Sequence, residues 1–86
     1  MLITKQTVAD KMAAYLRHEI TRAQLVDWAE SALMEGEFDE SEIHTLRAAV
    51  GRLGVADVRG FGLTWEACEE VLRDLGYTAR VDIVAP

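Results

Sequence analysis

The sequence contains little cysteine and little proline, and it has no long apolar segment. Cys68 is the single cysteine among 86 residues, so no disulfide can form within the chain, and a small disulfide-stapled scaffold is excluded. The single proline is the last residue, so proline interrupts no helix. The apolar runs are far shorter than the roughly 20 residues that a membrane-spanning helix needs. We therefore expect no membrane partner.

The N-terminal residues also lack the basic segment and apolar stretch of a signal peptide. Hydrophobic residues make up 50% of the chain and charged residues 28%, as in folded globular proteins. A chain of 86 residues is long enough to bury one hydrophobic core. We therefore expect a cytoplasmic protein in which residues 1–86 form a single helical domain.

Basic residues are few and scattered, which restricts the kind of partner. Nine Lys and Arg residues stand against fifteen Asp and Glu residues, and the formal net charge is −6. Proteins bind nucleic-acid backbones largely through clustered Lys and Arg, and this chain has no such cluster. A helix-turn-helix would need basic or amide side chains at the start of its recognition helix, where Glu40 and Glu42 stand instead. We therefore expect no nucleic-acid partner, and DNA binding is a less favoured alternative.

Four stretches carry apolar residues at intervals of three and four, the spacing of an amphipathic helix. Two of them begin with the residue pair of a capping box, Thr21 with Gln24 and Asp39 with Glu42. Glycines at positions 36, 54 and 76 follow three of the stretches and suit the left-handed conformation after a helix. The spacing predicts helices over residues 5–18, 22–35, 40–53 and 65–75.

The apolar stripe of the second predicted helix should be its buried side. This stripe comprises Leu25, Trp28, Ala29, Ala32 and Leu33. We expect Trp28, at its centre, to be mostly buried. The predicted fold class is all-α, a compact bundle of four short helices with a short C-terminal strand.

The C-terminal strand is predicted from a change of period. Apolar and polar residues alternate along Arg80–Val84, which is typical of a strand. A single strand needs a partner, and Leu2–Thr4 is the other candidate in the chain. The tail therefore pairs either with the N-terminus or with the same segment of a second chain, which would form a homodimer.

Acidic residues are concentrated in one part of the chain. No Lys or Arg interrupts the seven acids between Asp27 and Glu42. One interpretation is a solvated segment that keeps the protein soluble, and the other is a surface that attracts a basic protein partner. Under the second interpretation, the candidate binding residues are Asp27, Glu30, Met34, Glu35, Glu37, Asp39 and Glu40.

Two apolar residues admit two interpretations each. Met34 shares the outer side of its helix with Asp27 and Glu30, so it either contacts a partner or folds back under the following turn. Phe61 stands between two glycines in an apolar connection. It either plugs the end of the bundle or is a further partner-binding residue on a contact loop.

Residues able to support catalysis or hold a metal are few. His18, His44 and Cys68 lie far apart in the sequence and do not have the spacing of metal ligands. Glycine-rich phosphate loops are missing as well. We therefore expect no catalytic residue, no metal, no cofactor and no enzymatic activity.

The segment from Ala14 to Ala29 contains the pattern I-T-x-x-x-L-x-x-W. Within residues 8–33 it resembles the openings of small helical bacterial proteins, which include uncharacterised proteins and some similar to immunity proteins that neutralise toxins. This resemblance implies a helical fold and binding to a toxin. Together with the acidic segment, it predicts a non-enzymatic interaction module, an acidic inhibitor or immunity-type binder of a basic protein.

The alternative function is a small ligand-binding or enzymatic domain whose site forms in an oligomer. Such a domain should contain a deep polar pocket lined by His18, His44 or Cys68. An interaction module should instead capture one partner, with an affinity that falls as salt is added.

Overall fold

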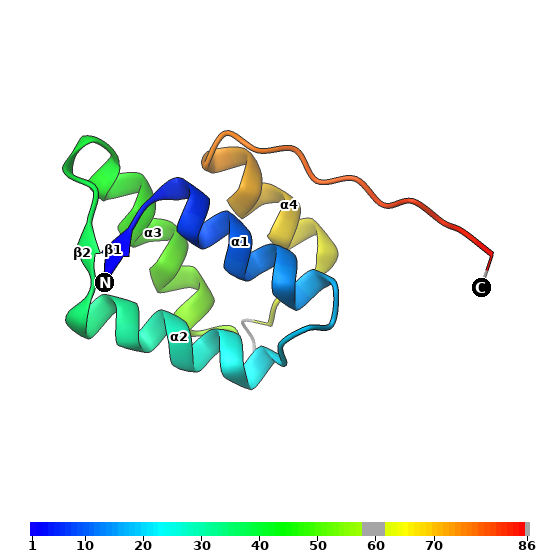
Figure 1. Cartoon of the computed structure of the whole chain (residues 1–86), viewed down its shortest axis with the longest axis horizontal. Helices are drawn as coiled ribbons and strands as arrows, with labels where there is room; N and C mark the ends of the chain where they lie inside the picture. The colour runs from blue at the N-terminus through cyan, green and yellow to red at the C-terminus, as the bar shows by residue number, and fades with distance from the viewer. Residues whose placement is uncertain (58–61, 86) are drawn as a thin grey trace.

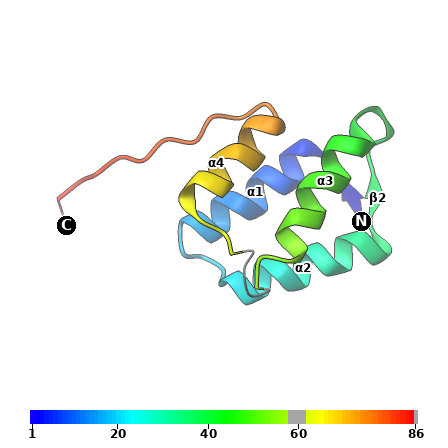
Figure 2. The ribbon, with the colours of Figure 1, turned by 180° about the vertical axis from the view of Figure 1, so that it is seen from behind.

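The computed structural model describes residues 1–57 and 62–85, in which four α-helices surround one core (Figure 1). The chain begins with strand β1 (Leu2–Ile3) and helix α1 (Lys5–Leu16). Helix α2 (Arg22–Glu35), strand β2 (Glu37–Phe38) and the 3-10 turn η1 (Glu40–Glu42) come next, followed by helices α3 (Ile43–Gly54) and α4 (Trp65–Asp74). Figure 2 shows from behind that α2 and α4 lie on opposite sides of the molecule, with α1 and α3 between them.

The four predicted helices are confirmed, with shifts of one to three residues at some ends. The capping box of α2 is present: the Thr21 N–H donates to Gln24 Oε1 at 2.8 Å, and the Gln24 N–H donates to Thr21 Oγ1 at 3.1 Å. Thr64 caps α4 with a single hydrogen bond, in which its Oγ1 accepts from the Ala67 N–H at 3.1 Å. None of these helices is both long enough and apolar enough to cross a membrane, as far as residues 1–57 and 62–85 are concerned.

The predicted start of the third helix is wrong. Asp39 instead caps the N-terminal end of the 3-10 turn, where its carboxylate accepts from the Ser41 N–H at 3.1 Å and from the Ser41 hydroxyl at 2.9 Å. Glu42 does not complete a capping box, and its carboxylate lies 3.1 Å from Lys5 Nζ. The sequence pattern could not indicate this ion pair, because Lys5 reaches Glu42 only through the tertiary structure.

Strand β1 pairs in parallel with β2, with Leu2 opposite Glu37 and Ile3 opposite Phe38. The Glu37 N–H donates to the Met1 carbonyl at 2.7 Å, and the Asp39 N–H donates to the Ile3 carbonyl at 3.0 Å. Ile3 is fully buried, so the pair anchors the N-terminus to the core. The partner of β1 therefore differs from the predicted one, because β1 pairs with β2 and not with the C-terminal tail.

Residues 77–85 form no strand; Tyr77 and Ala79 still pack against the core, and the last part of the tail extends away from the helices (Figure 1). Val81, Ile83 and Val84 are exposed by 64%, 95% and 80%. The predicted pairing of Arg80–Val84 with Leu2–Thr4 is therefore wrong for this structure. Pairing of the tail with a second chain stays a prediction.

Helix α2 buries a face that differs slightly from the predicted stripe. Leu25, Val26, Ala29 and Ala32 are buried, whereas Leu33 is 45% exposed. Trp28 is mostly buried, as expected, but at the edge of the core, where Lys11 Nζ lies 5.8 Å from the centre of its ring. The helical period fixes the width of an apolar face, and tertiary packing decides its rotation.

The glycines that follow the helices do not share one role. Gly76 has a φ of +89°, as predicted for a left-handed residue after a helix. Gly36 has a φ of −77° and a ψ of 148°, and Gly54 is the last residue of α3, so the prediction is wrong for both. Gly36 is needed for another reason: a Cβ there would lie 2.5 Å from the Ala32 carbonyl oxygen and 2.9 Å from Ile3 Cγ1.

Two leucines of α2 test the rotation of this helix. Leu25→Ala removes a fully buried side chain and should lower the free energy of unfolding by about 2–5 kcal/mol. Leu33→Ala should lower it by less than about 1 kcal/mol, since solvent already contacts that side chain. Urea denaturation of both variants measures the difference, and equal losses would contradict the described face.

Two glycines test the close contact between α2 and β1. Gly36→Ala should destabilise the fold by about 1–3 kcal/mol, because the new methyl group displaces the Ala32 backbone or Ile3. Gly51 lies in α3, and an added Cβ there would have no atom of residues 1–57 and 62–85 within 4 Å outside its own stretch of helix. Gly51→Ala should therefore stabilise the fold by about 0.5–1 kcal/mol through the higher helix propensity of alanine. Thermal and urea denaturation measure both effects, and changes of the same sign would refute the contact.

Candidate functional site

The predicted binding acids follow one edge of the molecule. Asp27, Glu30 and Glu35 lie on α2, Glu37 lies on β2, and Asp39 and Glu40 begin the η1 turn. In Figure 1 this segment runs along α2 and then turns upward through β2. We call the six acids the acidic rim. The six acids therefore follow a bent stretch of chain through α2, β2 and η1 and do not all lie on one helix face.

The acids of the rim differ in their bonding. Asp39 is engaged by Ser41, so its carboxylate has a structural role. The others make no salt bridge and accept no side-chain hydrogen bond from any residue in the described part of the chain, and all five are exposed: Asp27, Glu30, Glu35, Glu37 and Glu40. Five solvated carboxylates are therefore available to a partner.

Met34 lies on the same outer side of α2 as Asp27 and Glu30 and is 83% exposed. The interpretation that it folds back under the following turn is therefore wrong. Exposing so large an apolar side chain contributes nothing to the core, and methionine adapts easily to a partner surface. Met34 is thus an apolar contact point next to solvated acids.

Leu2 is a candidate contact residue that the sequence analysis missed. It is 62% exposed and stands opposite Glu37 in the parallel register. Register partners project to the same side of a sheet, so Leu2 accompanies Glu37 at the surface. Only the unforeseen pairing of β1 with β2 could have revealed it.

Phe61, the remaining predicted contact residue, lies outside the described residues. Of its neighbours in the apolar connection, Leu63 packs against the core and Val55 is 37% exposed. Leu63 also lines a pocket at the N-terminal end of α2.

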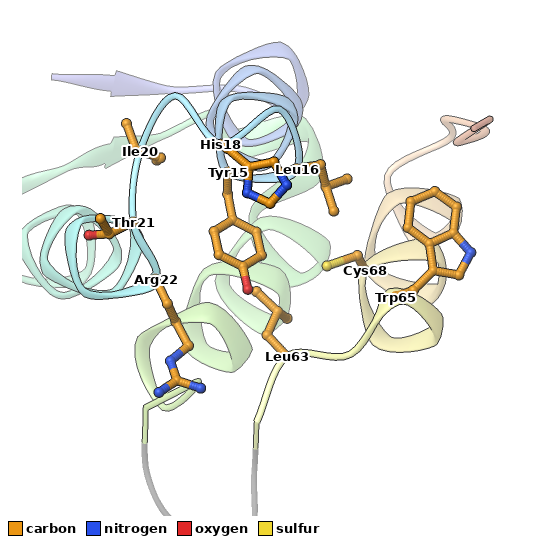
Figure 3. A pocket seen from close by; sticks show the side chains of 9 residues that line it. All are labelled: Tyr15, Leu16, His18, Ile20, Thr21, Arg22, Leu63, Trp65 and Cys68. Atoms are coloured by element: carbon orange, nitrogen blue, oxygen red, sulfur yellow. The ribbon is translucent and has the colours of Figure 1, made fainter. Parts of the chain in front are cut away.

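An open pocket with a cavity volume of about 620 Å³ lies between the end of α1 and the start of α4 (Figure 3). The side chains of Tyr15 and Cys68 point toward its interior from opposite helices, and Leu63 lies below them. The residues that line it are Tyr15, Leu16, His18, Ile20, Thr21, Arg22, Leu63, Trp65 and Cys68. His18 and Cys68 therefore share one pocket, while His44 lies elsewhere, on α3.

The backbone at His18 shapes the rim of this pocket. Helix α1 ends in a Schellman motif, in which the His18 N–H donates to the Tyr15 carbonyl at 3.0 Å and the Glu19 N–H donates to the Ala14 carbonyl at 2.8 Å. The residue that follows the helix C-cap in this motif adopts the left-handed conformation and is usually glycine. Here it is His18, with a φ of 62°, which costs about 1–2 kcal/mol for a residue with a side chain.

Arg22 brings a positive charge to the same pocket, and His18 adds an imidazole. No Asp or Glu is among the described residues that line it. Neither side chain takes part in a salt bridge with any residue of ranges 1–57 and 62–85. Arg22 also begins α2, and Glu35 ends it, so both charges oppose the helix macrodipole. Helix stability therefore does not account for either charge.

Cys68 is 1% exposed, and its sulfur points into the pocket from α4 (Figure 3). Burial raises the pKa of the Cys68 thiol above its ordinary value, and the positive charge of Arg52 offsets part of that rise. The thiol is therefore neutral near pH 7 and is a poor nucleophile. Within the described ranges, no three His, Cys, Asp or Glu side chains are grouped so that they could hold a metal ion.

The sequence analysis missed the pocket because its residues come from separate parts of the chain. Tyr15, Leu16 and His18 fall within the helix predicted over residues 5–18, whereas Trp65 and Cys68 fall within the one predicted over residues 65–75. One signal was present: the first predicted helix, unlike the other three, has no glycine after it. That absence points to a residue other than glycine in the left-handed position.

Comparisons with protein-family models, with curated proteins and with solved structures found no match. The resemblance to immunity proteins therefore stays a prediction.

The Cys68 thiol makes stability depend on pH above neutrality. Its pKa is raised above 9.0 in the folded protein, so the protonated thiol favours folding below about pH 9, and this contribution is lost as the pH rises toward the folded pKa. Cys68→Ala removes this dependence. Urea unfolding at neutral pH and at about pH 10 should show a steeper loss of stability for the wild type than for Cys68→Ala, and parallel losses would contradict the burial of the thiol.

Proposed function

We propose that the protein is a non-enzymatic interaction module that binds a basic protein through the acidic rim and Met34. The observation that carries this proposal is the 83% exposure of Met34 beside solvated carboxylates of the same helix. Protein interfaces commonly combine a small apolar contact region with a charged surround. A toxin of basic charge, of the kind that immunity proteins neutralise, is a partner of suitable chemistry.

The bonding of the nearby bases supports the proposal on electrostatic grounds, because they leave the solvated acids of the rim uncompensated. Lys5 pairs with Glu42, which lies outside the rim, and Arg47 packs 5.7 Å from the centre of the Phe38 ring. These two bases lie near the rim, yet neither pairs with its five solvated acids in the described part of the chain. A basic partner would therefore meet uncompensated negative charge.

The exposed apolar residues support a binding surface with two components. Met34 lies among the acids of α2, and Leu2 stands beside Glu37 at the surface of the sheet. Long-range charge attraction accelerates the encounter of two proteins. Apolar contacts made after the encounter mainly slow dissociation. The acids and the apolar residues should therefore affect different rate constants.

Charge neutralisation tests the acidic component. Glu35, Glu37 and Glu40 are exposed, so replacing all three with glutamine should leave the fold intact. The triple variant should associate with a basic partner about tenfold more slowly at low salt, and the difference should shrink at high salt. Partners captured from lysate by the wild type are identified first, and association rates are then measured with the purified partner.

A matched control and a second variant complete this test. Asp57, Asp74 and Asp82 are also exposed but lie off the rim, so replacing these three with asparagine removes the same charge without slowing association. Met34→Ala should raise the dissociation rate and leave the association rate unchanged. If both triple variants slow association equally, net charge and not the rim attracts the partner, and the proposal fails.

A further inference from the structure

We propose that the pocket between the end of α1 and the start of α4 binds a small organic anion with an aromatic body, such as an arylcarboxylate. This site is separate from the acidic rim and does not depend on the proposed protein partner. It lies at the N-terminal end of α2, whereas the rim begins at Asp27 and continues past the C-terminal end of that helix into β2 and η1 (Figures 1 and 3).

The interior of the pocket suits an aromatic or apolar body. Tyr15 enters from α1 and Leu63 from the connection before α4, and both also pack against the core. Trp65 lies at the edge of the pocket at the start of α4, with its ring turned away from Tyr15 and Cys68 (Figure 3). The volume of about 620 Å³ is within the range of small-molecule sites, which are mostly apolar with a few polar groups that orient the ligand.

The polar groups of the pocket suit a negative charge. Arg22 offers a guanidinium and His18 an imidazole N–H, both donors to a carboxylate. Among the described residues that line the pocket there is no carboxylate, although the chain contains fifteen Asp and Glu residues and has a net charge of −6. The formal charge among the described lining residues is that of Arg22, so the lining favours an anion over a cation.

The backbone supports a binding role for His18 in particular. Glycine would satisfy the Schellman motif without steric cost, yet the chain places an imidazole in the left-handed position. Strain of this kind concentrates at binding and active sites. His18→Gly should therefore raise the melting temperature and weaken ligand binding, two effects that a purely structural residue would not combine.

The test compares two probes of nearly equal shape by NMR titration of the full chain. The probes are 1-naphthaleneacetate, which is charged, and 1-naphthaleneacetamide, which is neutral. The charged probe should bind about tenfold more tightly, because hydrogen bonds to a charged group are the stronger ones. Its amide shift changes should be largest for residues 15–22 and 63–68.

Three variants identify the groups responsible. Arg22→Gln and His18→Gly should each lower the affinity ratio between the charged and the neutral probe. Arg17→Gln is the matched control. It removes the positive charge of an arginine that precedes Arg22 by five residues and lines a neighbouring pocket and not this one. That variant should keep the wild-type ratio.

The outcomes are decisive in both directions. A preference for the charged probe that localises to the pocket and falls in Arg22→Gln or in His18→Gly supports the proposal. Equal affinity for both probes overturns it, and so does a ratio unchanged in both variants. Shift changes centred on Gln6, Ala9 and Tyr77 would place the probe in the neighbouring pocket and would likewise overturn it.

Discussion

The two-residue pairing of β1 with β2 is the constraint on which one end of the molecule depends. It holds the buried Ile3 against Gly36 and links the N-terminus to the connection between α2 and α3. Two backbone hydrogen bonds, from the N–H groups of Glu37 and Asp39, flank the pair. The same pairing brings Lys5 to Glu42 and Leu2 to Glu37, so it determines which acids are compensated and which apolar residue accompanies them.

Helix α2 connects two surfaces of opposite character. Its first residue, Arg22, lines a pocket whose described lining residues include no carboxylate, and its last residue, Glu35, belongs to the acidic rim. The helix dipole adds positive potential at the first end and negative potential at the second. The side chains reinforce these potentials instead of neutralising them, which is unfavourable for the isolated helix and favourable for binding charged ligands at both ends.

His18 and Met34 are both residue types that their local backbone position or exposure does not favour. A glycine would fit the turn after α1 with less strain, and a polar residue would fit the outer face of α2 with less exposed apolar surface. Natural sequences depart from such local preferences chiefly at functional or strained positions. Both departures fall on the surfaces to which we assign binding.

The sequence by itself determined the four helices, the capping box at Thr21 and Gln24, and the left-handed Gly76, because each depends on residues three or four positions apart. It also determined that acids concentrate between Asp27 and Glu42. The tertiary structure alone decided the pairing of β1 with β2, the rotation of α2 that exposes Leu33, and the pocket that unites His18, Arg22 and Cys68. These features depend on contacts between residues far apart in the chain, and local spacing carries no information about such contacts.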